Sequence, residues 1–280
     1  MTETTPRPTG FATVMAQFDL GPYAEARGRL ALDLADRFGA RFVGVAAEPA
    51  LAPSVADFEA LGVQASAEEE RRFIEQDLAV AKKAFEAVTA GRNDVEWRGG
   101  IAIPDRFLIE QSRVADIVVV GRRASYDVHD LRLGVRPGLV AMECGRPVLV
   151  VPPEKEALVG KRAVVAWKDT REARRAVRDA LPILKRCQEV AVVSASASMR
   201  DESAEDVAGW LRRHEVPAEP RIIGGQIASI AEELLDVAGE IGADLIVSGA
   251  YGHSRTREWF FGGVTRDLLE TSHACLLMSH

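Results

Sequence analysis

Cysteine is scarce in this chain and long apolar runs are absent. These two features argue against a disulfide-rich or metal-binding protein and against a membrane-spanning one. Three cysteines occur in 280 residues, far apart and set among apolar neighbours. None belongs to a CxxC pair or to the spacing of a metal site, so we expect reduced thiols in a cytoplasmic protein. No apolar stretch approaches the roughly 18–20 residues that a membrane span needs. Residues 1–10 lack a signal-peptide pattern and are expected to form a flexible arm.

An excess of basic charge is also missing. The formal net charge is −7 and the isoelectric point is near 5.4. A general nucleic-acid-binding protein needs a basic footprint, so we expect no nucleic acid among the partners. A hydrophobic content of 47% with 28% charged residues is sufficient for a real core. The length suits two domains of about 140 residues each.

The familiar catalytic motifs are absent as well. The sequence has no GxGxxG after its first strand, no GxxxxGK[ST] and no GxSxG. Its histidines have no partners at metal-ligand spacing, so we expect no metal site. No residue pattern places a general base beside a nucleophile. A binding or regulatory protein is therefore favoured over an enzyme, with weak ATP hydrolysis as the most that we expect.

What the chain does contain is an internal repeat. Two segments placed 128 residues apart run in register without a gap. Ala115–Gly121 falls on Ala243–Gly249, Gly134 falls on Gly262, and the closing run 147–152 falls on 275–280. An apolar strand, a glycine turn, a second glycine, a helix and a final strand thus recur at one spacing.

Short apolar runs alternate with amphipathic stretches in both halves. Strands are predicted over 11–18, 42–48, 93–98, 116–121 and 147–151, then over 162–168, 189–195, 218–224, 244–249 and 274–279. Helices are predicted over 22–38, 65–90, 104–113 and 135–144, then over 171–186, 203–214, 227–241 and 263–272. Alternating β and α elements with continuous apolar strands predict a doubly wound α/β fold with parallel sheets.

These patterns predict two tandem domains, each a five-stranded parallel sheet flanked by helices. The first domain spans residues 1–152, a linker with two prolines and several charges spans 153–160, and the second domain spans 161–280. In open α/β sheets, ligands bind beyond the carboxyl ends of the strands, where the strand order reverses. In the second half, the segments expected there are 249–264 and 168–170.

The spacing Gly-x2-Gly-x9-Gly in residues 249–265, with small and hydroxyl residues after it, resembles the nucleotide loop of universal stress proteins. Residues 169–176 are also similar to that family's first turn and helix. The resemblance covers nearly the whole chain, as a tandem of two Rossmann-like domains of the adenine-nucleotide-hydrolase-like type. In nucleotide-binding members, the glycines and the backbone after the third glycine wrap ribose and triphosphate. The resemblance therefore implicates Gly249, Gly252, Gly262, Gly263 and Val264, with Thr265 as a nearby hydroxyl.

Two positions depart from the family pattern. Gly263 stands where many nucleotide-binding relatives carry Ser or Thr. Nucleotide-binding relatives tend to carry an acidic residue at the end of the first strand, and Lys168 aligns with that position. A shift of the alignment by one residue would place Asp169 there instead. A lysine can contact phosphate directly. Arg255 is a further phosphate candidate in the loop.

The loop of the first half departs further. Ala124 replaces the second glycine, and Asp127 and Asp130 add negative charge where the second half has Arg255 and Arg257. Each carboxylate near a partly exposed triphosphate weakens its binding by about 1 kcal/mol. We therefore expect the first domain to be a degenerate copy.

Three functions remain open from the sequence. The first is a tandem universal stress protein, a stress-response regulator whose second domain binds ATP, ADP or AMP, with or without Mg²⁺. The second is a nucleotide-free interaction scaffold. The third is a small-molecule carrier or slow ATPase. The resemblance also implies that the closing strands pair, either between the two domains of one chain or in a homodimer.

Overall fold

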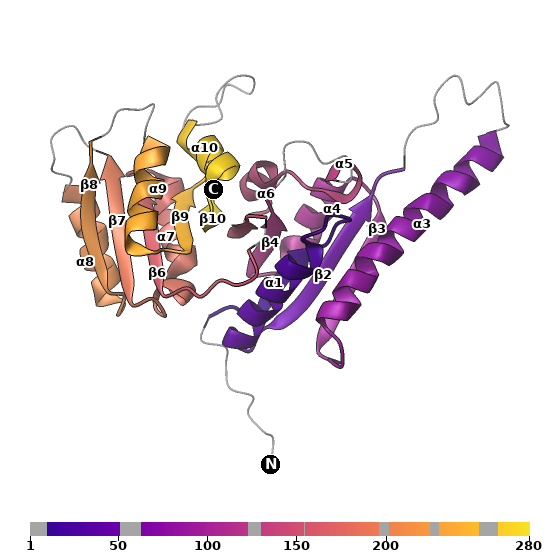
Figure 1. Cartoon of the computed structure of the whole chain (residues 1–280), viewed down its shortest axis with the longest axis horizontal. Helices are drawn as coiled ribbons and strands as arrows, with labels where there is room; N and C mark the ends of the chain where they lie inside the picture. The colour runs from indigo at the N-terminus through magenta and orange to yellow at the C-terminus, as the bar shows by residue number, and fades with distance from the viewer. Residues whose placement is uncertain are drawn as a thin grey trace, which may run out of the picture.

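The computed structural model describes residues 10–50, 63–122, 130–153, 155–195, 202–224, 230–251 and 263–280. These residues form a sheet with helices on both faces (Figure 1). Its strands are β1 (Thr13–Gln17), β2 (Arg41–Glu48), β3 (Val95–Ile101), β4 (Ile117–Gly121), β5 (Val148–Val151), β6 (Arg162–Trp167), β7 (Glu189–Ala195), β8 (Ala218–Ile223), β9 (Leu245–Gly249) and β10 (Cys275–Ser279). Each lies within two or three residues of its predicted bounds.

The helices follow the predicted alternation. They are α1 (Ala24–Phe38), α3 (Val63–Val88), α4 (Pro104–Gln111), α5 (Asp130–Leu133), α6 (Pro137–Glu143), α7 (Arg171–Leu184), α8 (Glu202–Arg213), α9 (Ile230–Ile241) and α10 (Gly263–Thr271). The sequence predicted neither the short α5 nor the 3-10 turn Ser112–Val114. Helix α6 begins two residues later than predicted because Pro137, which has no N–H to donate, occupies its first turn.

The strands of each half are parallel and follow one order. The full order is β3-β2-β1-β4-β5-β10-β9-β6-β7-β8. In the first half Val14 lies opposite Ile117, and in the second half Ala163 lies opposite Leu245. The doubly wound α/β class predicted from the sequence is therefore confirmed, and strand order reverses between β1 and β4 and again between β6 and β9.

An antiparallel strand pair joins the two halves into a single mixed sheet. Leu277 of β10 lies opposite Leu149 of β5, with Leu276 opposite Val150 and Met278 opposite Val148. These side chains are almost completely buried. The core of the first half is therefore continuous with that of the second.

Two layers of helices cover this sheet, as Figure 1 shows. Side chains of α1, α3, α7 and α8 pack in one apolar cluster, and those of α4, α6, α9 and α10 pack in the other. Neighbouring strand residues such as Val164 and Val165 point to opposite clusters, because successive side chains alternate across a strand. Among the described residues, no helix is long and apolar enough to cross a membrane.

Candidate functional site

The strand order reverses once in each half, and ligands of open α/β sheets bind beyond the carboxyl ends of the strands at such a point. In the second half, Gly249 ends β9 at the reversal point and Gly263 opens α10. Val264 is half-buried and Thr265 is buried. Three predicted residues, Gly252, Gly262 and Arg255, lie outside the described residues.

Packing requires a glycine at position 249. A Cβ built on Gly249 would lie 2.6 Å from the backbone N of Ala173 and 2.8 Å from the carbonyl carbon of Glu172. Both atoms belong to the first turn of α7, which therefore rests directly on the end of β9. A backbone contact cannot rotate away as a flexible side chain can, so the lack of a side chain here has a structural cause independent of any ligand.

Position 263 is different. The nearest atom to a Cβ built there is Oδ2 of Asp267, at 3.9 Å, and Gly263 is exposed. No described residue crowds this position, and its backbone is not left-handed. The first N–H groups of a helix have no partners within it and carry partial positive charge. The start of α10 thus presents backbone donors on an exposed residue.

Lys168 and Asp169 follow β6 and are both exposed. Asp169 Oδ1 accepts hydrogen bonds from Nε of Arg174 at 2.9 Å and from Nη2 at 2.6 Å. The next residue, Thr170, caps α7 by accepting from the N–H of Ala173 at 3.3 Å. The carboxylate of Asp169 is therefore held by a surface arginine of α7, the helix that follows it.

The buried carboxylate of Glu172, which was not predicted from the sequence, lies in the first turn of α7. Glu172 is 4% exposed and forms an ion pair with Arg171. Burial alone would raise the pKa of Glu172, but its hydrogen bonds with Arg171, with its own backbone N–H and with Thr170 hold the pKa below its usual value. Its place two residues after the capping Thr170, on the helix face with Ala173 and Ala176, is the sequence signal for its burial.

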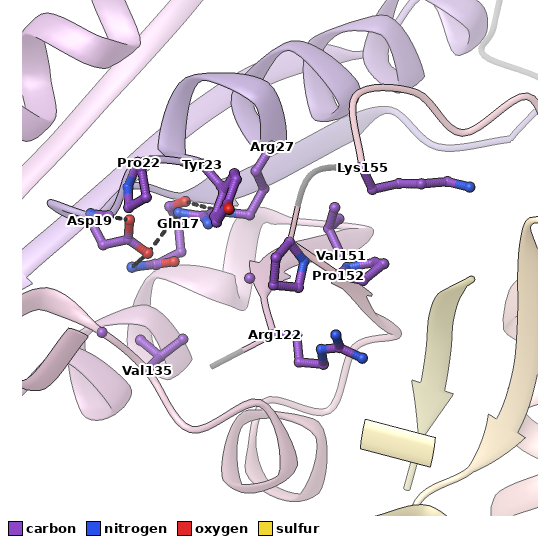
Figure 2. Close-up of a pocket in the computed structure, with 14 residues that line it drawn as sticks. Gln17, Asp19, Pro22, Tyr23, Arg27, Arg122, Val135, Val151, Pro152 and Lys155 are labelled. Atoms are coloured by element: carbon purple, nitrogen blue, oxygen red, sulfur yellow. Dashed lines mark hydrogen bonds and ion pairs between the residues drawn. The ribbon is translucent and has the colours of Figure 1, made fainter. Parts of the chain in front are cut away.

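The first half has a pocket at the corresponding reversal point, shown in Figure 2. Its volume is about 50 Å³. Polar and basic side chains from the two reversal strands and the following segments contribute to its wall: Gln17, Asp19, Tyr23, Arg27, Arg122 and Lys155, with Gly121 and Gly134 between them. Typical small-molecule pockets hold about 300 Å³ or more. Among the described residues, the space at this pocket is therefore smaller than that of a typical small-molecule pocket.

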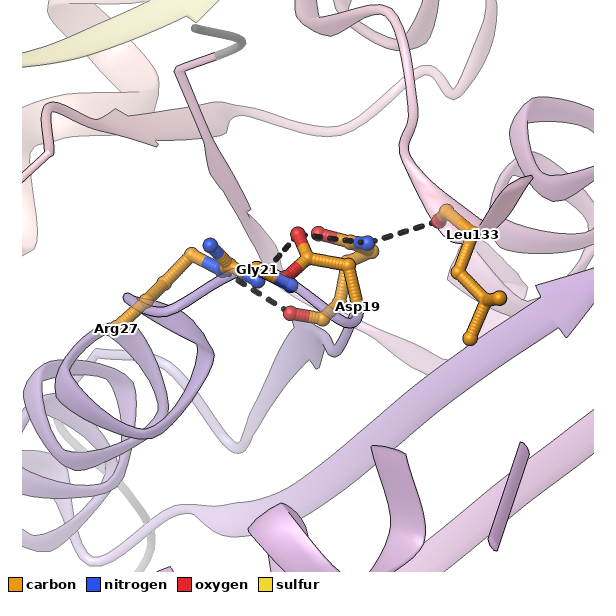
Figure 3. A network of polar contacts seen from close by, with 5 residues as sticks. Asp19, Gly21, Arg27 and Leu133 are labelled. Carbon is orange, nitrogen blue, oxygen red and sulfur yellow. Dashed lines mark hydrogen bonds and ion pairs between the residues drawn. The ribbon is translucent and has the colours of Figure 1, made fainter. Parts of the chain in front are cut away.

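A buried ion pair of two lining residues lies at this pocket, and Figure 3 shows it from close by. Nη2 of Arg27 lies 2.8 Å from Oδ2 of Asp19, and the two side chains are 6% and 7% exposed. Nε of Arg27 donates to the carbonyl of Gln17 at 3.1 Å. Nε2 of Gln17 in turn donates to the carbonyl of Leu133 at 3.0 Å, and the N–H of Gly21 donates to Oδ1 of Asp19 at 3.0 Å.

Arg27 also explains the glycine at the end of β4. A Cβ on Gly121 would lie 2.5 Å from Nη1 of Arg27. In the first half, the space beside the strand-end glycine is taken by a guanidinium group of the chain itself. Asp19 and Lys168 occupy the same place relative to the paired strands, so the acidic residue that Lys168 replaces in the second half is present in the first. Ala124 and Asp127 lie outside the described residues.

The strand order defines a doubly wound α/β protein of the Rossmann-like type, with two halves of the same architecture. Residues 160–280 match the model of the Universal stress protein family. The resemblance to universal stress proteins that the sequence predicted is therefore confirmed for this part of the chain.

Solved structures share the fold over nearly the whole chain. A universal stress protein from Archaeoglobus fulgidus is 16% identical, covers 95% of this chain and 97% of its own, and has a TM-score of 0.70. A Pseudomonas aeruginosa protein described as a universal stress protein is 13% identical, covers 95% and 92%, and has a TM-score of 0.56. At these identities the likeness shows the fold alone. No curated protein sequence matches the chain.

Proposed function

We propose that the chain is a tandem universal stress protein, a stress-response regulator whose second half binds ATP or a related adenine nucleotide. We further propose that its domains span residues 1–152 and 161–280, joined by the linker 153–160. The family match at 160–280 and the shared strand order of the two halves support this division.

The exposed start of α10 carries the proposal for nucleotide. No described atom lies closer than 3.9 Å to a Cβ built on Gly263, so no contact within the described part of the chain requires glycine there. A ligand that comes close to the backbone would explain a glycine at position 263. Free N–H groups at the N-terminus of a helix favour the binding of phosphate. We assign to the proposed site the residues that the sequence predicted: Gly249, Val264, Thr265, Lys168, Asp169, Gly252, Gly262 and Arg255.

The buried ion pair at the pocket of the first half supports an asymmetric protein. Arg27 supplies an internal cation, and Asp19 an internal anion, where a ligand would otherwise sit. Displacing this pair would leave two buried charges without partners, which is strongly unfavourable. We therefore propose one nucleotide site for each chain, in the second half.

The proposal also covers the metal ion, the cellular compartment and the oligomeric state. Among the described residues, no group of three His, Cys, Asp or Glu side chains could hold a metal ion; Mg²⁺ would come bound to the nucleotide phosphates and water. Cys144, Cys187 and Cys275 are free thiols, which supports a cytoplasmic protein. Since β5 and β10 already pair with each other, we propose that a homodimer forms through another surface.

Titration calorimetry of the full chain with ATP, ADP and AMP tests the proposal. Gly263→Asp places a carboxylate at the start of α10, where it favours the helix but repels phosphate, so we expect ATP binding to weaken by about tenfold or more. Gly263→Ala is the matched variant: it adds only a methyl group without a charge, so it should weaken ATP binding less than Gly263→Asp does. Gly252→Asp should also abolish binding.

Absence of heat and of thermal stabilisation at millimolar ATP in the wild type would reject the nucleotide proposal in favour of a nucleotide-free scaffold. Equal binding by the wild type and both aspartate variants would place the site elsewhere. A phosphate-release assay with Mg²⁺ then decides whether weak ATP hydrolysis accompanies binding.

A further inference from the structure

Tyr251 belongs to the second half but packs against the first. It lies two residues beyond Gly249, at the start of the glycine loop. A Cβ built on Gly138 would lie 2.1 Å from the Tyr251 hydroxyl and 3.0 Å from its Cζ. Gly138 is buried in the first turn of α6. The phenol ring therefore reaches across the junction and rests on backbone that only a glycine leaves open.

The backbone of Tyr251 is in an unusual conformation. Its φ is 55°, in the left-handed region, which a bulky residue rarely occupies. Such conformations persist where surrounding contacts impose them, and they gather at functional sites. Burial also raises the pKa of the Tyr251 phenol, in keeping with a ring removed from water.

The preceding residue is fixed from the other side. The N–H of Ala250 donates to the carbonyl of Ser279 at 2.8 Å, and Nδ1 of His280 lies 2.9 Å from the carbonyl oxygen of Ala250. The end of β10 thus holds residue 250, while α6 of the first half contacts residue 251. Together these contacts set the direction in which the chain leaves β9.

The first half has a related contact in the reverse direction. Arg122 follows Gly121 as Ala250 follows Gly249, and its Nη1 donates to the carbonyl of Ser272 at 2.6 Å. Ser272 directly follows α10. The glycine turn of each half is therefore in contact with the other half beside the β5–β10 junction.

We propose that Tyr251 is a positioning residue through which the first half, at Gly138, fixes the direction in which the chain leaves β9 and thereby sets the affinity of the second half for adenine nucleotide. This inference rests on the proposed function. A loop held in place before the ligand arrives loses less conformational entropy on binding, so its affinity is higher. The first half, in which Arg27 and Asp19 occupy the corresponding position, then acts by holding Tyr251 of the second half in place.

The test uses the full chain carrying Gly138→Ala, a change in α6 that lies outside the proposed nucleotide site. The added methyl group displaces the phenol, so we expect ATP affinity in calorimetry to fall about fivefold or more. Amide hydrogen exchange should become faster at residues 250 and 251 while β9 stays protected. Gly239→Ala in α9 is the matched control, because nothing lies within 4 Å of its added Cβ, and it should change neither readout.

A double variant separates positioning from general damage. Gly138→Ala with Tyr251→Phe removes the hydroxyl that lies nearest to the new methyl group, so most of the lost affinity should return. If Gly138→Ala does not fold, Tyr251→Gly serves instead, since glycine accepts the left-handed backbone. It should show the same weakened binding and faster exchange.

Each outcome decides between the two proposals. A wild type that binds no ATP overturns the proposed function and the affinity role of Tyr251, and hydrogen exchange alone then tests the contact with α6. A wild type that binds, together with unchanged affinity and exchange in Gly138→Ala, overturns the inference but keeps the nucleotide site. If the double variant loses as much ATP affinity as Gly138→Ala alone, the loss comes from damage to α6, and this result also overturns the inference.

Discussion

At the scale of single residues, the buried pair of Arg27 and Asp19 is the most consequential feature of the first half. Arg27→Ala would leave the Asp19 carboxylate buried without its partner, so we expect the free energy of unfolding to fall by about 3–5 kcal/mol. Arg27→Met with Asp19→Asn removes both charges and should be much milder. Urea denaturation measures both variants.

An exposed ion pair gives the control for that measurement. Arg29 and Glu25 lie on the solvent side of α1, with side chains 56% and 50% exposed. Arg29→Ala should lower the free energy of unfolding by less than about 1 kcal/mol. A similar small loss for Arg27→Ala would contradict the view that its guanidinium neutralises a buried carboxylate.

A second residue-scale prediction concerns Glu48, at the end of β2. Its carboxylate is buried and forms an ion pair with Arg132, but Oε2 has no hydrogen-bond partner. Burial raises the pKa of Glu48 above its ordinary 4.5; Arg132 opposes this rise, and Asp77 and Glu70 add to it. The folded protein therefore binds the proton of Glu48 more tightly than the unfolded chain does. This contribution to stability is complete below pH 4.5 and is lost as pH rises through the folded pKa.

Glu48→Gln removes this titration. We expect its free energy of unfolding to rise relative to the wild type as pH increases from about 4 toward 7. Urea denaturation at intervals of one pH unit measures the difference, and Glu25→Gln on the exposed face of α1 provides the comparison. A wild-type-to-variant difference that is flat with pH would contradict the raised pKa.

At the scale of elements, the glycines at positions 249 and 263, which flank the second half's glycine loop, are there for different physical reasons. Gly249→Ala forces a Cβ against the backbone of α7, so we expect a loss of about 1–3 kcal/mol in the free energy of unfolding. Gly263→Ala adds a methyl group in open space and should leave stability within about 0.5 kcal/mol. Its effect should appear in nucleotide affinity instead. Thermal and urea unfolding beside calorimetry measure the two variants, and equal destabilisation by both would contradict this distinction.

The elements themselves were largely readable from the sequence, for a physical reason. Strands such as β4, whose residues Ile117 to Val120 are completely buried, appear as continuous apolar runs because helices cover both faces of the sheet. Arg27 was not recognised, because a basic residue in an amphipathic helix usually faces solvent. Its spacing with Ala24, Ala31 and Leu34 places it on the buried face of α1, and this is the signal that could have identified it.

Contacts between the halves were harder to predict. The repeat predicted the same succession of strands and helices in each half, but the packing of Tyr251 on Gly138 joins residues 113 positions apart, with no local pattern to mark it. The steric cause of Gly249 was hidden for the same reason, since the glycine and the α7 backbone meet only in the folded chain. The spacing of the glycines suggested a ligand for both 249 and 263, and the structure gives a packing cause to the first.

At the scale of the whole molecule, the β5–β10 pair determines which sheet edges remain free. In the full chain the outer strands of the sheet are β3 and β8. Pro220 interrupts the row of N–H donors along β8, as is common in edge strands. The apolar strand β10 is paired along its length and does not present an edge to other chains.

Expressing residues 153–280 alone removes the partner of β10. Leu276, Leu277 and Met278, which are buried in the full chain, would then lie on a free and strongly apolar edge strand. Such an edge is a template for pairing with another chain. We therefore expect the isolated half to form dimers through antiparallel β10–β10 contacts, with its mass by light scattering twice that of one copy. The full chain at the same concentration is the control, and hydrogen exchange should find β10 protected in both. A monomeric isolated half with an unprotected β10 would contradict the prediction, and would mean that the second half does not need a partner strand to bury this edge.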